Sequence, residues 1–131
     1  MRIERLNERN HFVLFGLHWS AYSERIEAAY RRERALFDPA NVPNDILAHM
    51  GKDIDRLLEA YEVAWEALRW RASRRAHRAV VVEEGALKNA IEHYLGGGQM
   101  AAMRGKTEEA RDCLLRVADL DPNDTKATNL I

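Results

Sequence analysis

The stretch IEAAYRRERALFDPANVPNDILAHMGKDIDRLLEAYEVAWEAL, residues 26–68, decides the fold. Its first part repeats apolar residues at helical spacing and must end near Phe37, because Pro39 disfavours helical geometry at the residue before it. After Pro43 the apolar residues resume at intervals of three and four, which predicts one long helix that begins near Asn44. Two helices with so short a connection pack antiparallel. The sequence therefore predicts a helical hairpin.

The composition favours a chain with a buried core, and the helical spacing of its apolar residues predicts an all-α protein. Of 131 residues, 47% are hydrophobic and 31% are charged, which is enough to bury a core. The formal net charge of -1 argues against a chain that coats nucleic acid or a membrane. The single cysteine, Cys113, predicts a reducing compartment, and the charged N-terminus MRIERLNERN is followed by no apolar run of a signal peptide or membrane span. We expect a cytoplasmic protein.

The other segments are also predicted to be helical. Gly16 ends a short first helix, because glycine tolerates the backbone conformation that closes a helix. Residues 83–104 and 107–120 form a second hairpin around the turn at residues 104–106. The segment NDTKATNLI, residues 123–131, is predicted to begin a further helix or a capping helix.

The second helix is predicted to bury one face and to expose its arginines. Ile26 and Ala29 lie on the buried face, and Glu33 shares that face as the one residue that we do not expect to be buried. Ser20 or Ser23 is the predicted N-terminal cap, since a serine oxygen accepts from the free amides of the first turn. The arginines predicted to point to water are Arg25, Arg31, Arg32 and Arg34.

Two motifs, HFVLFGL (residues 11–17) and IEAAYRR (residues 26–32), have the spacing of the first two helices of a J-domain. Over residues 10–79 the chain resembles this family, the module of DnaJ-like co-chaperones. The resemblance implies an antiparallel helical hairpin whose His-Pro-Asp tip is needed to stimulate ATP hydrolysis by a DnaK-type chaperone. The tip positions here are Asp38, Pro39 and Ala40, so only the proline is kept. We do not expect stimulation by this route.

The end of this resemblance leaves alternatives open. EAYEV (residues 59–63) and AWEALRWRASRRAH (residues 64–77) both match the family's Ala-Tyr-x-x-Leu slot, and the second keeps the spacing without gaps. The second stretch lacks the Ser-Asp-Pro break that separates the third and fourth helices in the family. A fused third and fourth helix is therefore one of the expectations.

The second half resembles a single tetratricopeptide repeat, through GKTEEARDCLLRVADLDPND, residues 105–124. One repeat does not bury both of its faces alone, so this hairpin is expected to pack on the first half, on a partner protein or on a second copy. We accordingly expect a J-domain-like domain over residues 1–79 and a tetratricopeptide-like hairpin over residues 80–131. The signature positions of the repeat are filled by Tyr94, Gly98, Ala101, Ala110, Leu114, Val117 and Pro122.

The sequence carries no motif for catalysis, a cofactor or a metal. The five histidines lack paired ligand spacing, and Gly96-Gly97-Gly98 lacks the strand and lysine of a phosphate loop. The leading hypothesis is a non-enzymatic adaptor or scaffold, derived from a DnaJ-like co-chaperone, that binds another protein. Binding would use the repeat hairpin or the basic helix faces. The candidate partner-binding residues are Arg25, Arg31, Arg32, Arg34, Arg71, Arg74, Arg75 and Arg78.

Two alternatives complete the set. One is a residual co-chaperone that docks a DnaK-type chaperone through the basic second helix. The other is a helical nucleic-acid binder that uses the stripe at residues 69–78, although the many acidic residues elsewhere argue against it. Asp-Pro is a common sequence in turns. This favours the interpretation that Asp38-Pro39 only connects two helices over the alternative that it has become a contact site for a different protein. Self-association through the incomplete repeat also remains open.

Overall fold

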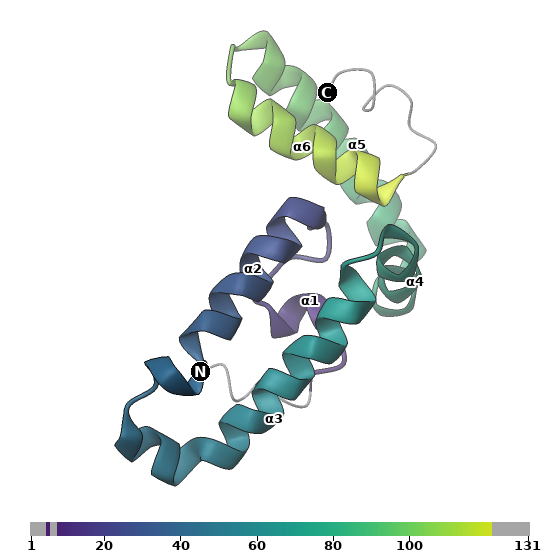
Figure 1. Cartoon of the computed structure of the whole chain (residues 1–131). Helices are drawn as coiled ribbons and strands as arrows, with labels where there is room; N and C mark the ends of the chain where they lie inside the picture. The colour runs from purple at the N-terminus through teal and green to yellow at the C-terminus, as the bar shows by residue number, and fades with distance from the viewer. Residues whose placement is uncertain (1–4, 6–7, 122–131) are drawn as a thin grey trace. The chain divides into compact units, whose positions relative to one another are not determined.

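The computed structural model describes residue 5 and residues 8–121, and every regular element in that part of the chain is a helix. The all-α prediction is therefore confirmed. Pro122 and the predicted further helix at residues 123–131 lie outside the described residues. No helix in the described part combines the length and apolar character needed to cross a membrane. The elements in Figure 1 are α1 (His11–Leu14), α2 (Ser23–Leu36), the 3-10 helix η2 (Pro39–Asn41), α3 (Asn44–Leu68), α4 (Arg71–Val81), α5 (Glu84–Met103) and α6 (Thr107–Leu120).

The chain divides into two compact units. The first comprises residues 1–19 and 23–74, and the second comprises residues 20–22 and 75–131. The sequence suggested a boundary after residue 79, and it gave no sign that Ser20–Tyr22 belongs with the C-terminal part. The second unit is therefore built from two separate pieces of chain.

The first unit packs α1 and α2 against α3. The predicted hairpin of α2 and α3 is present, and the aromatic side chains of Phe15 and Tyr61 stack at its centre with ring centroids 5.4 Å apart. Each large side chain fully removed from water stabilises the unit by about 1.5–3 kcal/mol relative to an exposed one. Its buried apolar residues are Phe12, Leu14, Phe15, Ile26, Ala29, Ile54, Leu57, Tyr61, Ala64 and Leu68.

Glu33 corrects a sequence expectation, because it is 1% exposed. Its carboxylate accepts a hydrogen bond from the Tyr61 hydroxyl (3.2 Å) and one from Nε of Arg32 (3.4 Å). A buried carboxylate is tolerated when donors satisfy it. The periodicity placed Glu33 on the inner face, and a tyrosine hydroxyl from α3 makes that position acceptable.

A two-residue break separates α3 from α4, so these helices are not fused. The Ser73 hydroxyl donates to the carbonyl of Ala67 (2.7 Å), and the Arg74 guanidinium donates to the carbonyl of Leu68 (2.7 Å). The last carbonyls of a helix have no partner inside it. Side chains at the start of α4 supply those partners, which ends α3 without the proline motif of the family.

The second unit contains the predicted hairpin of α5 and α6. Gly105 has φ +74°, and the amide of Lys106 donates to the carbonyl of Ala101 (2.9 Å), which closes the end of α5. Glycine is preferred at this position because other residues are strained there. The core of the hairpin is formed by Leu114 and Val117, with Ile91, Tyr94 and Leu95 packed against it.

Candidate functional site

The turn after α2 is held by its own polar side chains. Asp38 accepts a hydrogen bond on Oδ1 from the amide of Ala40 (2.9 Å), and the side-chain amide of Asn41 donates to the carbonyl of Ala35 (2.9 Å). The first bond caps η2 and the second satisfies a carbonyl at the end of α2. Asp38, Pro39 and Ala40 are all exposed. The carboxylate at the tip is thus engaged in the local turn.

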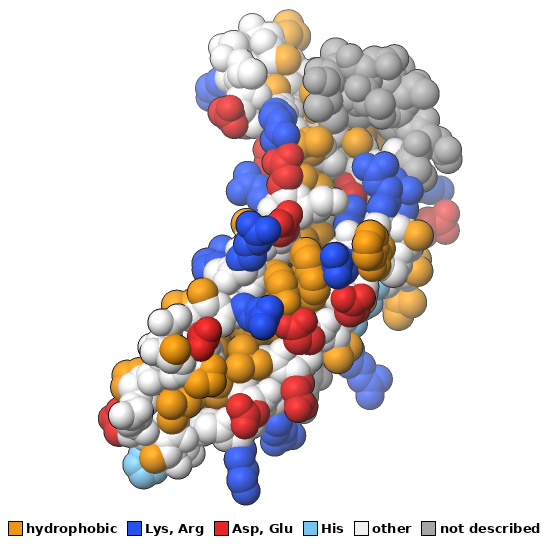
Figure 2. Space-filling view, in the orientation of Figure 1, with side chains coloured by type: hydrophobic (Ala, Val, Ile, Leu, Met, Phe, Trp, Pro, Cys, Tyr) orange, Lys and Arg blue, Asp and Glu red, His pale blue; other side chains and the backbone are white. Residues whose placement is uncertain are grey.

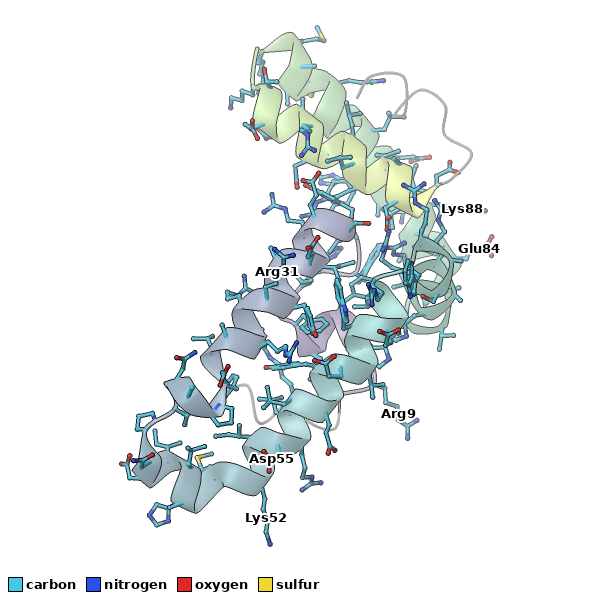
Figure 3. The ribbon with its side chains drawn as sticks, viewed as in Figure 1. Arg9, Arg31, Lys52, Asp55, Glu84 and Lys88 are labelled. Atoms are coloured by element: carbon cyan, nitrogen blue, oxygen red, sulfur yellow. The ribbon has the colours of Figure 1, made fainter. Side chains whose placement is uncertain are left out.

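The four arginines of α2 are exposed, as expected, but three of them are paired with glutamates. Arg31, which extends from α2 into solvent in Figure 3, contacts Glu27 at 2.6 Å. Arg34 contacts Glu62 of α3 at 3.3 Å. Arg32 contacts the buried Glu33. This face consequently carries both signs of charge, which suits a protein partner better than a row of phosphates.

A stack of aromatic rings and guanidinium groups runs along the α2–α3 face, and no pattern within a single helix predicted it. The rings of Tyr30 and Trp65 are parallel with centroids 4.4 Å apart. The Arg69 guanidinium lies 5.1 Å from the Trp65 ring and 4.6 Å from the Trp70 ring, and Arg34 lies over Tyr30 at 5.7 Å. Exposed contacts of this kind contribute about 0.5–1 kcal/mol each. The stacked residues come from two different helices, so the periodicity along one helix does not reveal that they meet.

The same face has a small hollow and a line of apolar side chains. The hollow has a volume of about 230 Å³ and lies beside Trp65, Arg69 and Trp70, with the Trp70 side chain 58% exposed. Burial raises the pKa of the Tyr30 hydroxyl, and its hydrogen bond to Glu62 raises that pKa further. Figure 2 shows apolar side chains between α2 and α3, with acidic residues along the α3 side.

The arginines of α4 do not form one solvent-exposed face, which corrects the expectation that all four of them are available to a partner. Within the first unit Arg74 is 0% exposed, and it donates to the Ser23 hydroxyl (3.2 Å) as well as to the end of α3. Ser23 is the first residue of α2, and Ser20 is buried instead of capping it. Arg71 is exposed. The burial of Arg74 removes it from any partner-binding surface.

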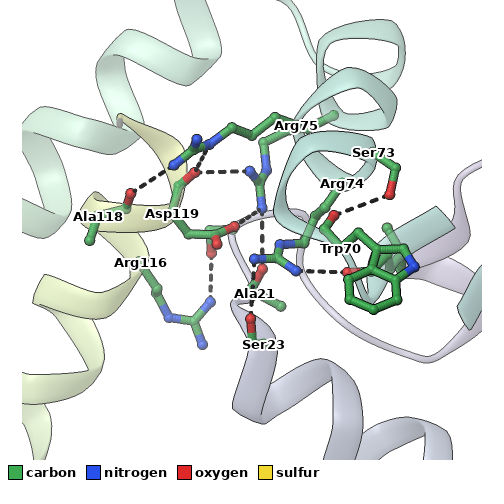
Figure 4. Close-up of polar contacts among 12 residues, drawn as sticks. Ala21, Ser23, Trp70, Ser73, Arg74, Arg75, Arg116, Ala118 and Asp119 are labelled. Carbon is green, nitrogen blue, oxygen red and sulfur yellow. Dashed lines mark hydrogen bonds and ion pairs between the residues drawn. The ribbon is translucent and has the colours of Figure 1, made fainter. Parts of the chain in front are cut away.

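In the second unit, Arg75 and Arg78 bind the C-terminal end of α6. Arg78 is 2% exposed and pairs with Asp119 at 2.6 Å. Arg75 donates to the carbonyls of Ala118 (3.4 Å) and Asp119 (3.2 Å), as Figure 4 shows. Cations are favourable at this end because the last carbonyls of a helix are unsatisfied and partly negative. Arg78 is therefore a buried structural residue and is no longer a candidate for partner binding.

Within the described residues, the signature positions of the repeat lie where α5 and α6 meet. Gly98 approaches α6 so closely that an added Cβ would stand 3.1 Å from Leu114 and 3.2 Å from Cys113. Tyr94 is partly buried. Burial raises the pKa of the half-buried Cys113 thiol, with the carboxylates of Asp112 and Glu109 adding to the effect. The buried signature residues are Gly98, Ala101, Ala110, Leu114 and Val117.

A larger groove lies along the α5–α6 hairpin. Its volume is about 670 Å³, and Met103 at its edge is 87% exposed. Met100, on the same helix, is 53% exposed. Exposed methionines of this kind adapt to differently shaped apolar partners. The groove is lined by Gly98, Gln99, Ala102, Met103, Thr107, Ala110, Arg111 and Leu114.

The described residues bring together no three His, Cys, Asp or Glu side chains in an arrangement that would hold a metal ion. Comparison of the chain with protein-family models, with curated proteins and with solved structures gives no match. The candidate sites are therefore the groove of the second unit and the mixed-charge face of the first.

Proposed function

We propose that this chain is a non-enzymatic protein-interaction module, an adaptor or scaffold, whose α5–α6 groove docks an amphipathic helix of another protein. The observation that carries the proposal is the apolar groove of about 670 Å³ beside Met103, a large side chain left 87% exposed. Exposed apolar surface of this kind is a common mark of a binding groove.

The shape of the groove supports a helical occupant. Its lining on α6 extends from Thr107 to Leu114, which at about 1.5 Å per residue is about two helical turns. Ala102 is exposed in the lining, and its small side chain lets a partner backbone come close. A helix that offers apolar side chains at positions i, i+3 and i+7 would fill such a groove.

Charge at the turn end of the groove defines the partner further. Arg104 is exposed in the turn between α5 and α6, and Arg111 is exposed in the groove lining, whereas Lys106 in the turn is paired with Glu109 (3.9 Å). A carboxylate on the partner helix would find complementary potential here, which favours one orientation of that helix. The partner we propose is therefore an amphipathic helix with an acidic residue at one end.

Photo-crosslinking in the cells that produce the chain tests this proposal. A benzophenone amino acid replaces Gln99 in the groove, and a control variant carries it at Glu108, which is exposed but outside the groove lining. We expect crosslinking from position 99 alone, to an apolar and acidic helical segment identified by mass spectrometry, and saturable binding of that segment after synthesis. Equal crosslinking from both positions, or crosslinking to a second copy of the chain, would contradict the proposal.

A second candidate function rests on the exposure of Arg31 and Arg32, whose side chains are 76% and 55% exposed. In this alternative α2 docks a DnaK-type chaperone, in keeping with the J-domain resemblance. ATP hydrolysis by such a chaperone, measured with the chain and with the double variant Asp38→His/Ala40→Asp, tests it. Stimulation that appears only in the double variant would support docking without signalling, and no change with either protein would remove this candidate.

A further inference from the structure

The hollow that α2 and the end of α3 form in the first unit is bordered by an ordered array of aromatic rings. The Tyr30 hydroxyl donates to Glu62 (2.7 Å), which fixes the ring that stacks on Trp65. The Arg69 guanidinium lies over the rings of both Trp65 and Trp70. Side chains that are already ordered lose little conformational entropy when a ligand binds. The array is therefore a preformed surface.

The residue types in this array are those that contribute most to binding at protein interfaces. Tryptophan, tyrosine and arginine are enriched among the residues whose truncation costs the most affinity. The array brings all three types together around a hollow of about 230 Å³. Trp70, the most exposed of its rings, is 58% exposed. Clustered apolar exposure beside a hollow points to a partner protein.

The tryptophans also offer hydrogen-bond donors. Within residues 8–121, the indole N–H groups of Trp65 and Trp70 donate to no protein acceptor. An indole N–H is a donor only, so an occupant with free acceptors would complement them. The carbonyls of an α-helix bond within the helix, whereas a polyproline II segment has no internal hydrogen bonds and leaves its carbonyls free. The donors therefore favour an extended, polyproline II occupant.

The charges around the hollow cancel in ion pairs. Glu27, which lines the hollow, contacts Arg31 at 2.6 Å, and Arg69 contacts Glu66 at 3.3 Å. Charges that are already paired give little net attraction to a phosphate or to a strongly charged peptide. The site instead complements an uncharged, apolar segment. Proline-rich segments meet this requirement, and they dock in aromatic-lined grooves.

We propose that the hollow beside Trp65 and Trp70 is a docking site for an uncharged, proline-rich segment of another protein in the polyproline II conformation. Proline rings pack against the indole rings, and the indole N–H groups donate to carbonyls of the segment. The lining of this hollow shares no residue with that of the α5–α6 groove, so this inference is independent of the proposed function.

A nuclear magnetic resonance titration of the full chain, labelled with ¹⁵N, tests this site with a peptide of ten prolines. The chain has three tryptophans, and single Trp→Phe variants assign their indole N–H resonances. We expect saturable shifts for Trp65 and Trp70, and none for Trp19, which does not line the hollow. A peptide of five Gly-Ser repeats has the same length but is flexible, and it should cause no shift. The absence of saturable shifts with the proline peptide, or equal shifts with both peptides, would overturn the proposal.

Substitutions at Trp70 separate the contribution of the ring from that of the donor. Trp70→Ala should weaken binding of the proline peptide at least about tenfold. Trp70→Phe keeps a ring and loses the N–H, so it should weaken binding by about two- to tenfold. Val63→Ala is the matched control, because Val63 is 63% exposed on α3 and lies outside the lining. Equal affinity of Trp70→Ala and Val63→Ala, with helix content preserved in both, would contradict the proposal.

Discussion

Replacing Gly98 by alanine tests the close packing of α5 on α6. Alanine improves the intrinsic helix propensity of an interior position by about 0.8–1 kcal/mol. At Gly98 the new Cβ would lie 3.1 Å from Leu114 and 3.2 Å from Cys113. Carbon atoms pack best at about 3.5–4.0 Å, so α6 must move or Leu114 must change its conformation. Overpacking of this kind costs about 1–3 kcal/mol. We expect Gly98→Ala to leave stability unchanged or to lower it by up to about 2 kcal/mol.

Two neighbouring glycines are matched controls on the same helix. An added Cβ at Gly96 meets nothing within 4 Å, and one at Gly97 meets only the Cys113 sulfur at 3.8 Å, an ordinary contact. Gly96→Ala and Gly97→Ala should therefore keep most of the propensity gain and stabilise the chain by about 0.5–1 kcal/mol. The difference between Gly98→Ala and Gly96→Ala, about 1–3 kcal/mol, isolates the packing cost.

Equilibrium urea unfolding of the three variants measures this difference. Far-ultraviolet circular dichroism follows all helices, whereas fluorescence follows the three tryptophans, Trp19, Trp65 and Trp70, which all belong to the first unit. The change at Gly98 should appear in the circular dichroism transition. If Gly98→Ala stabilises the protein as much as Gly96→Ala does, the account of the helix crossing is wrong.

Three further predictions concern the buried pair, a histidine and a turn. Arg78→Met should lower the free energy of unfolding by about 3–5 kcal/mol, because it removes the guanidinium that pairs with the buried Asp119 carboxylate. Arg78→Met/Asp119→Leu should recover part of the loss, and simple additivity of the two changes in urea unfolding would count against the pairing. Burial lowers the pKa of His11 from its ordinary 6.5, so the stability contributed by its neutral form is complete above about pH 6.5 and declines as the pH falls through the lowered value. His11→Asn should therefore flatten the pH dependence of urea unfolding below neutrality, and an unchanged profile would refute this assignment. Gly105→Ala should lower the thermal midpoint, since φ +74° costs a residue with a Cβ about 1–2 kcal/mol, whereas Gly85→Ala, with an open position on α5, should not.

The sequence predicts the helices well because their signals are local. Pro39 ends α2, Gly16 ends α1 with φ +70°, and α3 begins at Asn44 as expected and continues to Leu68. These features depend on spacing along one helix and on residues with restricted backbone geometry. Both can be read without knowing what lies opposite.

The candidate sites were harder to predict because their partners come from distant segments. Arg78 reads as a charged surface residue until Asp119, forty-one positions away, is placed beside it. Glu33 reads as exposed until the Tyr61 hydroxyl is placed beside it. The role of Ser20 as an acceptor for Arg116 has no local signal at all. Long-range polar pairing, rather than helix formation, is what a single sequence leaves undetermined.

The most direct test of the proposed docking function is a calorimetric titration of the crosslinked partner segment into the full chain. The groove variant Ala102→Glu is compared with Ala86→Glu, which makes the same change at an exposed position of α5 outside the groove lining. The account predicts one binding site, at least a tenfold loss of affinity for Ala102→Glu, and unchanged affinity for Ala86→Glu, with helix content preserved in both. Equal affinity for the two variants would contradict the assignment of the groove.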